Sequence, residues 1–270
     1  MKQEMIRQIL LDVREHQPLI HCITNSISIN QCANAILAVG GRPIMAEHPM
    51  EVAEITRTAK ALMLNLGNIT DARMESIRIS AEKASENGLP ILLDAVGIAC
   101  SQLRRNYIHE LLSALTPTVI KGNYSEIYAL YQDSYHSSGV DAEDLDVTTL
   151  SLAAVTLARE MNTIILASGK VDIVTDGNWL VHIHNGTTQL STITGTGCML
   201  GALCATYLSA NISLEAVITA SALLGIAGEK TKTDRGSGTF FVNLMDALST
   251  LTAEDICKNI KLEEISLENI

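Results

Sequence analysis

Residues 194–201 read Thr-Gly-Thr-Gly-Cys-Met-Leu-Gly and place a cysteine where a glycine loop meets a predicted helix. Gly195 and Gly197 allow backbone N–H groups to converge on an anion, and the apolar residues that follow predict a buried helix whose N-terminus faces the loop. A helix N-terminus also favours the ionised form of a thiol, here that of Cys198. An anion site and an ionisable side chain therefore share one turn, which indicates group transfer at a phosphate.

The glycine loop does not match the usual nucleotide-binding motifs, and a tight turn with a buried cysteine is the alternative interpretation. A dinucleotide fingerprint starting at Gly195 requires glycine at position 200, which is Leu200. A Walker A motif ending at Gly169-Lys170 requires glycine at position 164, which is Ile164. The three consecutive small-residue amides of the loop favour the anion site.

Two carboxylates and a lysine stand near the ends of predicted strands. Asp94 closes an apolar run, where a carboxylate is costly unless it meets a cation, a metal or hydrogen-bond donors, although it could simply cap the next helix. Lys121 ends a neighbouring run, and Glu126 falls in the first turn of the helix that follows. Glu126 could merely favour the helix dipole, or it could hold Mg²⁺ through water together with Asp94.

The first predicted strand ends in polar residues. Asn25 or Ser26 could cap a helix that begins near Ile27. Met45 ends another predicted strand, whereas we expect the other methionines in the core. Three histidines lack metal-ligand spacing and are expected to be structural or surface residues: His21, His182 and His184.

Alternating strands and helices are predicted to position these residues. Six apolar runs predict strands: 18–25, 42–48, 61–68, 89–96, 116–123 and 162–169. Segments of helical length, such as 70–87 and 101–115, separate them. This alternation predicts an α/β fold with a mostly parallel central sheet and helices on both faces, in which ligands bind at the carboxyl ends of the strands.

The pattern changes after residue 170. Residues 172–184 predict a hairpin around Asp176-Gly177, because Asp-Gly favours a tight turn. Three further helical stretches are 198–210, 214–231 and 238–250, and the acidic segment 132–147 reads as a solvated loop. No repeat or linker divides the chain, so we expect a single domain over residues 1–270.

Composition excludes several function classes. The net charge of −11, without a basic run, argues against nucleic acid or anionic lipid as the main partner. The six cysteines form no C-x-x-C pair, which argues against a zinc knuckle. The N-terminus, residues 1–17, predicts an amphipathic helix and not a signal peptide, and no apolar run reaches the about 18 residues needed to span a bilayer. We expect a cytoplasmic protein.

Six segments, in order along about residues 5–250, resemble hydroxyethylthiazole kinase of the ribokinase-like superfamily. They are HCITN-x-I…N (21–30), GG-x-P-I-M (40–45), LNLG (64–67), LLDAVG (92–97), KGN-x-SEI (121–127) and TGTGCMLG (194–201). The resemblance implies a ribokinase-like fold and phosphorylation of the hydroxyl of 4-methyl-5-(2-hydroxyethyl)thiazole with ATP and Mg²⁺ in thiamine salvage. It also implies a homotrimer with active sites at subunit contacts.

The resemblance further implies a role for each matching residue. Cys198 would be the base, and residues 194–198 would form the anion hole. The ATP contacts would be Lys121, Ser168, Thr194, Gly195, Thr196 and Gly197. The metal would be organised by Asp94 and Glu126. The thiazole would contact Asn25, Ile27, Met45, Gly67 and Gly195.

Other function classes remain open at this point. Cys198 could be a covalent nucleophile with a histidine as base, or the chain could be a non-catalytic nucleotide sensor. A hydroxymethylpyrimidine or sugar kinase of the same superfamily is a further alternative. The thiazole kinase is the favoured hypothesis, with a contribution from Cys198 of about 10²-fold at most.

Overall fold

The computed structural model describes residues 3–135 and 145–269 and is built on one sheet. Within these residues the sheet has nine strands in the order β2-β1-β3-β4-β5-β6-β7-β8-β9. Their bounds are β1 Leu19–Ile23, β2 Arg42–Ile44, β3 Ala61–Asn65, β4 Ile91–Asp94, β5 Val119–Asn123, β6 Ile164–Ser168, β7 Asp172–Thr175, β8 Leu180–Ile183 and β9 Leu262–Ile265. The strands from β2 to β6 pair in parallel, whereas β7, β8 and β9 pair antiparallel.

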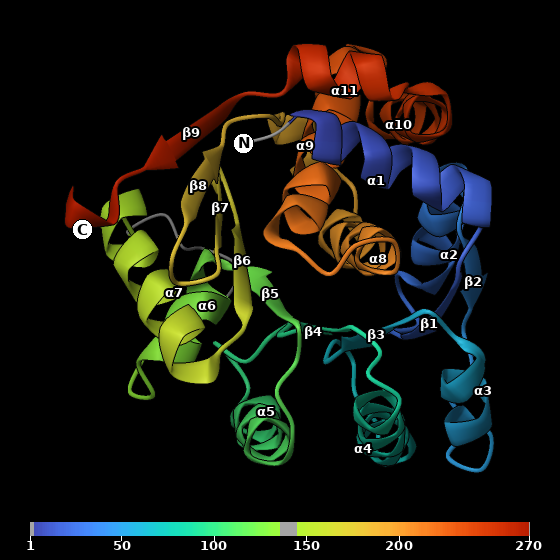
Figure 1. Ribbon diagram of the computed structural model, residues 1–270, viewed down its shortest axis with the longest axis vertical. Coiled ribbons are helices and arrows are strands. Elements are labelled where there is room, and N and C mark those ends of the chain that lie inside the picture. The colour runs from blue at the N-terminus through green and yellow to red at the C-terminus, as the bar shows by residue number, and fades with distance from the viewer. Residues whose placement is uncertain (1–2, 136–144, 270) are drawn as a thin grey trace.

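Helices cover both faces of this sheet (Figure 1). One face carries α1 Gln3–His16, α2 Ile29–Ala38, α8 Thr196–Leu208, α9 Leu214–Lys230, α10 Ser237–Thr250 and α11 Ala253–Asn259. The other face carries α3 Val52–Thr58, α4 Asp71–Glu86, α5 Gln102–Ala114, α6 Tyr124–Tyr131 and α7 Val147–Met161. The 3₁₀ helices are η1 Thr188–Thr192 and η2 Leu267–Asn269. The predicted α/β class is confirmed.

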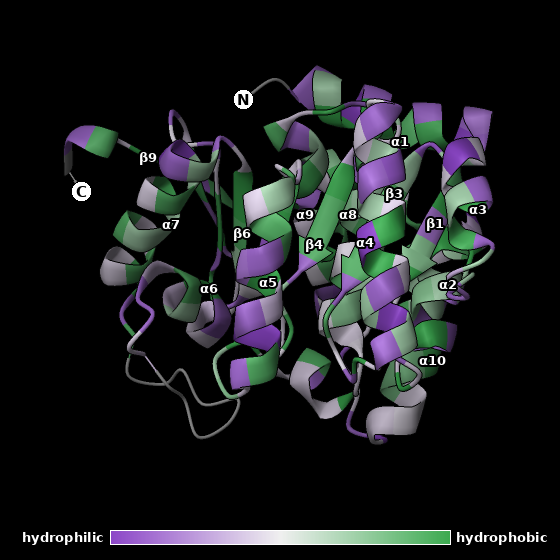
Figure 2. Ribbon diagram, turned by 90° about the horizontal axis from the view of Figure 1, so that it is seen from below, coloured by the Kyte–Doolittle hydropathy of each residue, from purple (hydrophilic) through white to green (hydrophobic). Residues whose placement is uncertain are grey.

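The strands are apolar on both faces because each face packs under helices. Met63 joins the core beneath α1, α2, α8 and α9, while its neighbours Leu62 and Leu64 join the core beneath α4 and α5. Figure 2 shows the hydrophobic strands at the centre and hydrophilic residues along the outer helices α4 and α5. Two cores therefore hold the sheet in place and leave its carboxyl edge for polar residues.

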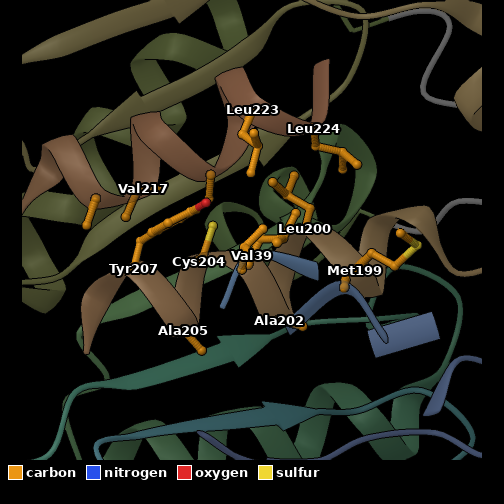
Figure 3. Close-up of a cluster of buried hydrophobic side chains, with 14 of the residues drawn as sticks. Val39, Met199, Leu200, Ala202, Cys204, Ala205, Tyr207, Val217, Leu223 and Leu224 are labelled. Atoms are coloured by element: carbon orange, nitrogen blue, oxygen red, sulfur yellow. The ribbon is translucent and has the colours of Figure 1, made fainter. Parts of the chain in front are cut away.

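Helix α8 is buried along nearly its whole length, from Met199 to Leu208. Figure 3 shows Ala202 and Ala205 on the side of α8 that faces the strands, and Tyr207 on the side that faces α9. A helix that is apolar all round must be enclosed by protein. This enclosure fixes α8, and with it the N-terminus that carries the glycine loop.

The predicted hairpin is also confirmed. Asp176 Oδ1 accepts hydrogen bonds from the backbone N–H groups of Asn178 and Trp179, and Gly177 adopts a φ of 87°. Trp179 directly precedes the return strand β8 and is 60% exposed. The hairpin extends the parallel sheet with an antiparallel edge.

Several boundaries differ from the sequence predictions. β2 ends at Ile44 and is shorter than the predicted strand 42–48, whereas α2 begins at Ile29, two residues after Ile27 and close to the predicted start. Helices α3, α7 and α11 and strand β9 were not predicted. Most of the predicted loop 132–147 lies in residues 136–144, outside the described residues. Among the helices of residues 3–135 and 145–269, none has the length and hydropathy to cross a membrane.

Candidate active site

Polar residues from four parallel strands meet at the carboxyl edge of the sheet, next to the N-terminus of α8. The register places Asn65 at the end of β3 beside Asp94 at the end of β4, and Asp94 beside Lys121 on β5. Asn25 follows β1 by two residues, and Cys198 lies in the first turn of α8. Hydrogen bonds connect these five residues, which the sequence places far apart.

Asp94 and Lys121 form a buried ion pair, with Nζ 3.0 Å from Oδ1. Burial raises the pKa of Asp94 to about 6, although the charge of Lys121 lowers it. Burial lowers the pKa of Lys121, but the neighbouring acidic groups, with Asp94 first among them, together outweigh that effect, so that this pKa is raised overall. The alternative that Asp94 caps the next helix is wrong, because Ser101 caps α5 by accepting from the backbone N–H of Arg104.

Glu126 fastens the start of α6 to the loop that follows β4. Its Oε2 accepts from the backbone N–H of Asn123, which completes a capping box, and its Oε1 accepts from the backbone N–H of Gly97. Its charge also raises the pKa of Asp94 after the effect of burial. Glu126 therefore caps α6, and the two carboxylates lie close enough to interact.

The carboxylates of Asp94 and Glu126 fit a hydrated Mg²⁺ better than a directly bound one. Each of their four oxygens already accepts a hydrogen bond, from Lys121, Asn65, Asn123 or Gly97. Mg²⁺ dehydrates reluctantly and usually keeps several waters. The remaining lone pairs can accept hydrogen bonds from those waters, so the donor set is compatible with the ion.

The N-terminus of α8 has no side-chain cap. Gly195 is the N-cap residue with a φ of 88°, and its side-chain position would lie 2.9 Å from Cβ of Ser28, so only glycine suits this position. A Cβ at Gly197 would lie 3.4 Å from Nζ of Lys121. Free N–H groups, the helix dipole and an ammonium group thus converge at one exposed glycine turn.

Cys198 is half-buried, and its sulfur meets two side-chain amides. Nδ2 of Asn25 and Nδ2 of Asn65 both lie 3.3 Å from Sγ. No histidine of the described residues is hydrogen-bonded to this sulfur. The covalent alternative with a histidine base therefore finds no support in the geometry.

The surroundings of the three histidines confirm the expectation that they are structural or surface residues. His21 is buried between Oγ1 of Thr56 and the carbonyl of Ala46. His182 lies against Ser151, and His184 pairs with Glu263 at the surface. None of the three lies in the network around Cys198.

Other predicted site residues surround the network without joining it. Met45 follows β2 and packs partly buried against the core, and Ile27 is 62% exposed. Ser168 Oγ donates to the carbonyl of Gly122. The hydroxyl of Thr196 donates a hydrogen bond to the carbonyl of Leu190, so only the backbone N–H of Thr196 is left for an anion at the loop. Thr194 is exposed.

The sequence interpretation missed the central position of Asn65. Asn65 is fully buried and contacts both Asp94 and Cys198. The available signal was an asparagine closing an otherwise apolar strand. Gln31 was also missed: its Oε1 is buried with no hydrogen-bond partner among the described residues, and nothing in the sequence distinguishes it from a surface glutamine.

Comparisons with known proteins agree with this architecture. A ribokinase-like superfamily protein from Enterococcus faecalis V583 superposes with a TM-score of 0.63 at 11% identity, covering 93% of each chain, which is a likeness of fold alone. A structure of hydroxyethylthiazole kinase protein from Pyrococcus horikoshii OT3 has a TM-score of 0.89 at 34% identity, covering 97% of this chain and 100% of that one. Hydroxyethylthiazole kinase 2 of Clostridium botulinum (strain Hall) is 44% identical, covering 94% of this chain and 98% of the relative.

The mostly parallel sheet, with a glycine loop and a buried lysine–aspartate pair at its carboxyl edge, defines the fold class as ribokinase-like α/β. The profile of the hydroxyethylthiazole kinase family matches residues 10–254. The chain belongs to this family. The resemblance drawn from the six sequence segments is thereby confirmed.

Proposed function

We propose that this protein transfers the γ-phosphoryl group of ATP to the hydroxyl of 4-methyl-5-(2-hydroxyethyl)thiazole in thiamine salvage. The family and the names of the relatives support this substrate. The observation that carries the proposal is the uncapped N-terminus of α8, with Lys121 beside it and Cys198 in its first turn. The hydroxyl of the substrate, the N–H groups that bind the phosphoryl group and the sulfur that accepts the proton would then meet at one turn of helix.

Positioning and charge neutralisation would supply most of the rate. The backbone N–H groups of residues 194–198 and the dipole of α8 would stabilise the charge on the equatorial oxygens of the transferred phosphoryl group. Lys121 and Ser168 would contact the nucleotide from the ends of β5 and β6. Asn25, Ile27, Met45, Gly67 and Gly195 would surround the thiazole, with its hydroxyl in line with the γ-phosphorus.

Cys198 would take the proton from the hydroxyl as the oxygen attacks. Its partners are neutral amides, so no charged base assists it, and we expect a contribution of about 10²-fold at most. Asp94 and Glu126 would hold Mg²⁺ through water. When bound, the ion would neutralise and orient the β- and γ-phosphate oxygens.

We further propose a single-domain protein over residues 1–270 that works in the cytoplasm as a homotrimer, with each active site at a subunit contact. The exposure of Ile27 at 62% and of Met50 at 91% supports this assembly, because both lie in segments that follow β1 and β2 at the carboxyl edge of the sheet. Analytical ultracentrifugation tests the assembly. A monomer at micromolar concentration would contradict it.

Release of ADP tests the proposed reaction most directly. ATP and Mg²⁺ are incubated with the thiazole alcohol, with hydroxymethylpyrimidine, with simple sugars and with no acceptor. We expect ADP release that depends on both Mg²⁺ and the thiazole alcohol. Preferential turnover of another acceptor would overturn the substrate, and ATP binding without ADP release under any condition would favour a nucleotide sensor. Mass labelling of Cys198 by the alcohol without ATP would favour a covalent thiol enzyme.

A further inference from the structure

The orientations of two buried side-chain amides are fixed by backbone N–H groups, which can only donate. Oδ1 of Asn25 accepts from the backbone N–H groups of Ile27 and Ser28, at 3.1 and 3.0 Å. Oδ1 of Asn65 accepts from the backbone N–H of Gly67 at 2.8 Å. Each oxygen is therefore identified by its partner, and each Nδ2 must be the donor on the other side.

All four amide protons of Asn25 and Asn65 then have acceptors. Nδ2 of Asn25 donates to Oδ1 of Asn65 at 3.1 Å and to Sγ of Cys198 at 3.3 Å. Nδ2 of Asn65 donates to Oδ2 of Asp94 at 2.9 Å and to the same sulfur at 3.3 Å. Both side chains are at least 95% buried, so water does not compete for these bonds. The network is fully satisfied only if the sulfur accepts twice.

The close packing of the Asn25 and Asn65 amides leaves no room for a side chain at residue 67, which is a glycine. A Cβ at residue 67 would lie 2.8 Å from Oδ1 of Asn65 and 3.0 Å from Nδ2 of Asn25. Any side chain at this position would push the two amides apart. The glycine therefore permits the close approach of the pair, independently of any contact with a substrate.

We propose that Asn25 and Asn65 are positioning residues that hold the sulfur of Cys198 as a hydrogen-bond acceptor, aimed to receive the proton of the substrate hydroxyl. Two N–H donors stabilise negative charge on the sulfur and leave one lone pair for the alcohol. In the transfer, the alcohol oxygen forms its bond to the γ-phosphorus, the bond from that phosphorus to the oxygen of ADP breaks, and the hydroxyl proton passes to Sγ. The ionised sulfur becomes a thiol, and ADP leaves with the electron pair of the broken bond.

The role of Cys198 as proton acceptor rests on the proposed function. The two hydrogen bonds that the side-chain amides donate to its sulfur can be tested without any substrate. Iodoacetamide alkylates the ionised sulfur, and mass spectrometry of the peptides follows Cys198 at a fixed pH, with the exposed Cys100 as an internal reference. Asn25→Asp retains the oxygen that accepts from Ile27 and Ser28 but faces the sulfur with a second oxygen. We expect the alkylation of Cys198 to slow by about tenfold or more relative to Cys100.

Two further variants separate the network from charge and from folding. Asn34→Asp adds the same charge at an exposed position of α2, where the amide is hydrogen-bonded to Asn30, and should leave the alkylation rate unchanged. Gly67→Ala displaces the amides without adding charge and should slow the alkylation as Asn25→Asp does. Circular dichroism confirms that each variant folds; if Asn25→Asp does not, Gly67→Ala decides by the same measurement.

Kinetics provide the second readout. Asn25→Asp should lower kcat by about tenfold or more and change the KM for ATP, which Asn25 does not contact in the proposed complex, by less than about threefold. In a Cys198→Ala background the same substitution should cost less than about threefold, because the sulfur on which it acts is gone. Wild-type alkylation rates in both Asn25→Asp and Gly67→Ala, or an undiminished kinetic cost in the Cys198→Ala background, would overturn the proposal. If no acceptor gives ADP release, the proposed function fails, while the alkylation result still decides whether the amides act on the sulfur.

Discussion

Nζ of Lys121 lies 3.0 Å from Oδ1 of Asp94, and the two side chains are 4% and 0% exposed. The pair links strands β5 and β4 at the edge where the anion site lies. The other oxygen of Asp94 accepts from Asn65, which continues to Cys198. One series of hydrogen bonds therefore connects the ammonium group of Lys121 to the sulfur of Cys198.

Removing one member of this ion pair should destabilise the protein strongly. Lys121→Met leaves a buried carboxylate without its cation, which costs roughly 3–5 kcal/mol of unfolding free energy. The double variant Lys121→Met with Asp94→Asn should recover part of that loss, because no charge remains uncompensated. Urea unfolding followed by circular dichroism measures both. A single variant within about 0.5 kcal/mol of the wild type would show that the pair contributes nothing.

The sulfur of Cys198 should matter for turnover more than for binding. Cys198→Ala removes the proposed proton acceptor but leaves the backbone N–H groups of the loop in place. We expect kcat to fall by a factor of up to about 10², with the KM for ATP changed by less than about threefold. Steady-state ADP release is the measurement. An alanine variant with wild-type kcat would remove the base from the mechanism.

The contribution of His21 to the unfolding free energy should decrease as the pH falls below 6.5. Burial lowers the pKa of His21 below 6.5, so the unfolded chain takes up a proton that the folded protein resists. The contribution of His21 is therefore complete above pH 6.5 and is lost as the pH decreases. His21→Gln cannot titrate, and its unfolding free energy should vary less steeply with pH between 6.5 and 5 than that of the wild type. Equal slopes would contradict the assignment.

Two helix glycines should respond in opposite directions to alanine. A Cβ at Gly225, in the middle of α9, would lie 2.6 Å from the backbone oxygen of Asn185, whereas a Cβ at Gly238 in α10 would meet nothing within 4 Å. We expect Gly225→Ala to lower the unfolding free energy by roughly 1–3 kcal/mol through overpacking. Gly238→Ala should be neutral or raise it by up to about 1 kcal/mol through helix propensity. Thermal unfolding distinguishes the two, and a stabilised Gly225→Ala would refute the steric argument.

The parallel part of the fold follows from local sequence because its strands are continuous apolar runs. Runs such as 61–68 and 89–96 are too apolar to face solvent, and the segments between them are long enough for a crossover helix. Strand β9 escaped prediction because LEEI is polar and short, and only its pairing with β8 makes it a strand. Helix α7 escaped because its start lies beside an acidic segment that resembles a loop.

Some members of the buried network carry a signal in the sequence, but the network itself does not. Asp94, Lys121 and Cys198 each carry a local signal: an ionisable group after an apolar run or beside glycines. The contacts of Asn65 depend on strand register, which places it beside Asp94, and on the position of α8, which brings the sulfur of Cys198 within 3.3 Å of its Nδ2. The spacing of the residues along the chain predicts neither the contact of Asn65 with Asp94 nor its contact with Cys198.

The exposed indole of Trp179 has a practical consequence for all the unfolding experiments above. It is the single tryptophan of the chain, and it already faces solvent at the tip of the β7–β8 hairpin in the native state. The wavelength of its fluorescence emission should therefore shift little when the protein unfolds. The absorbance of the buried phenols of Tyr107 and Tyr207 will follow that transition more faithfully.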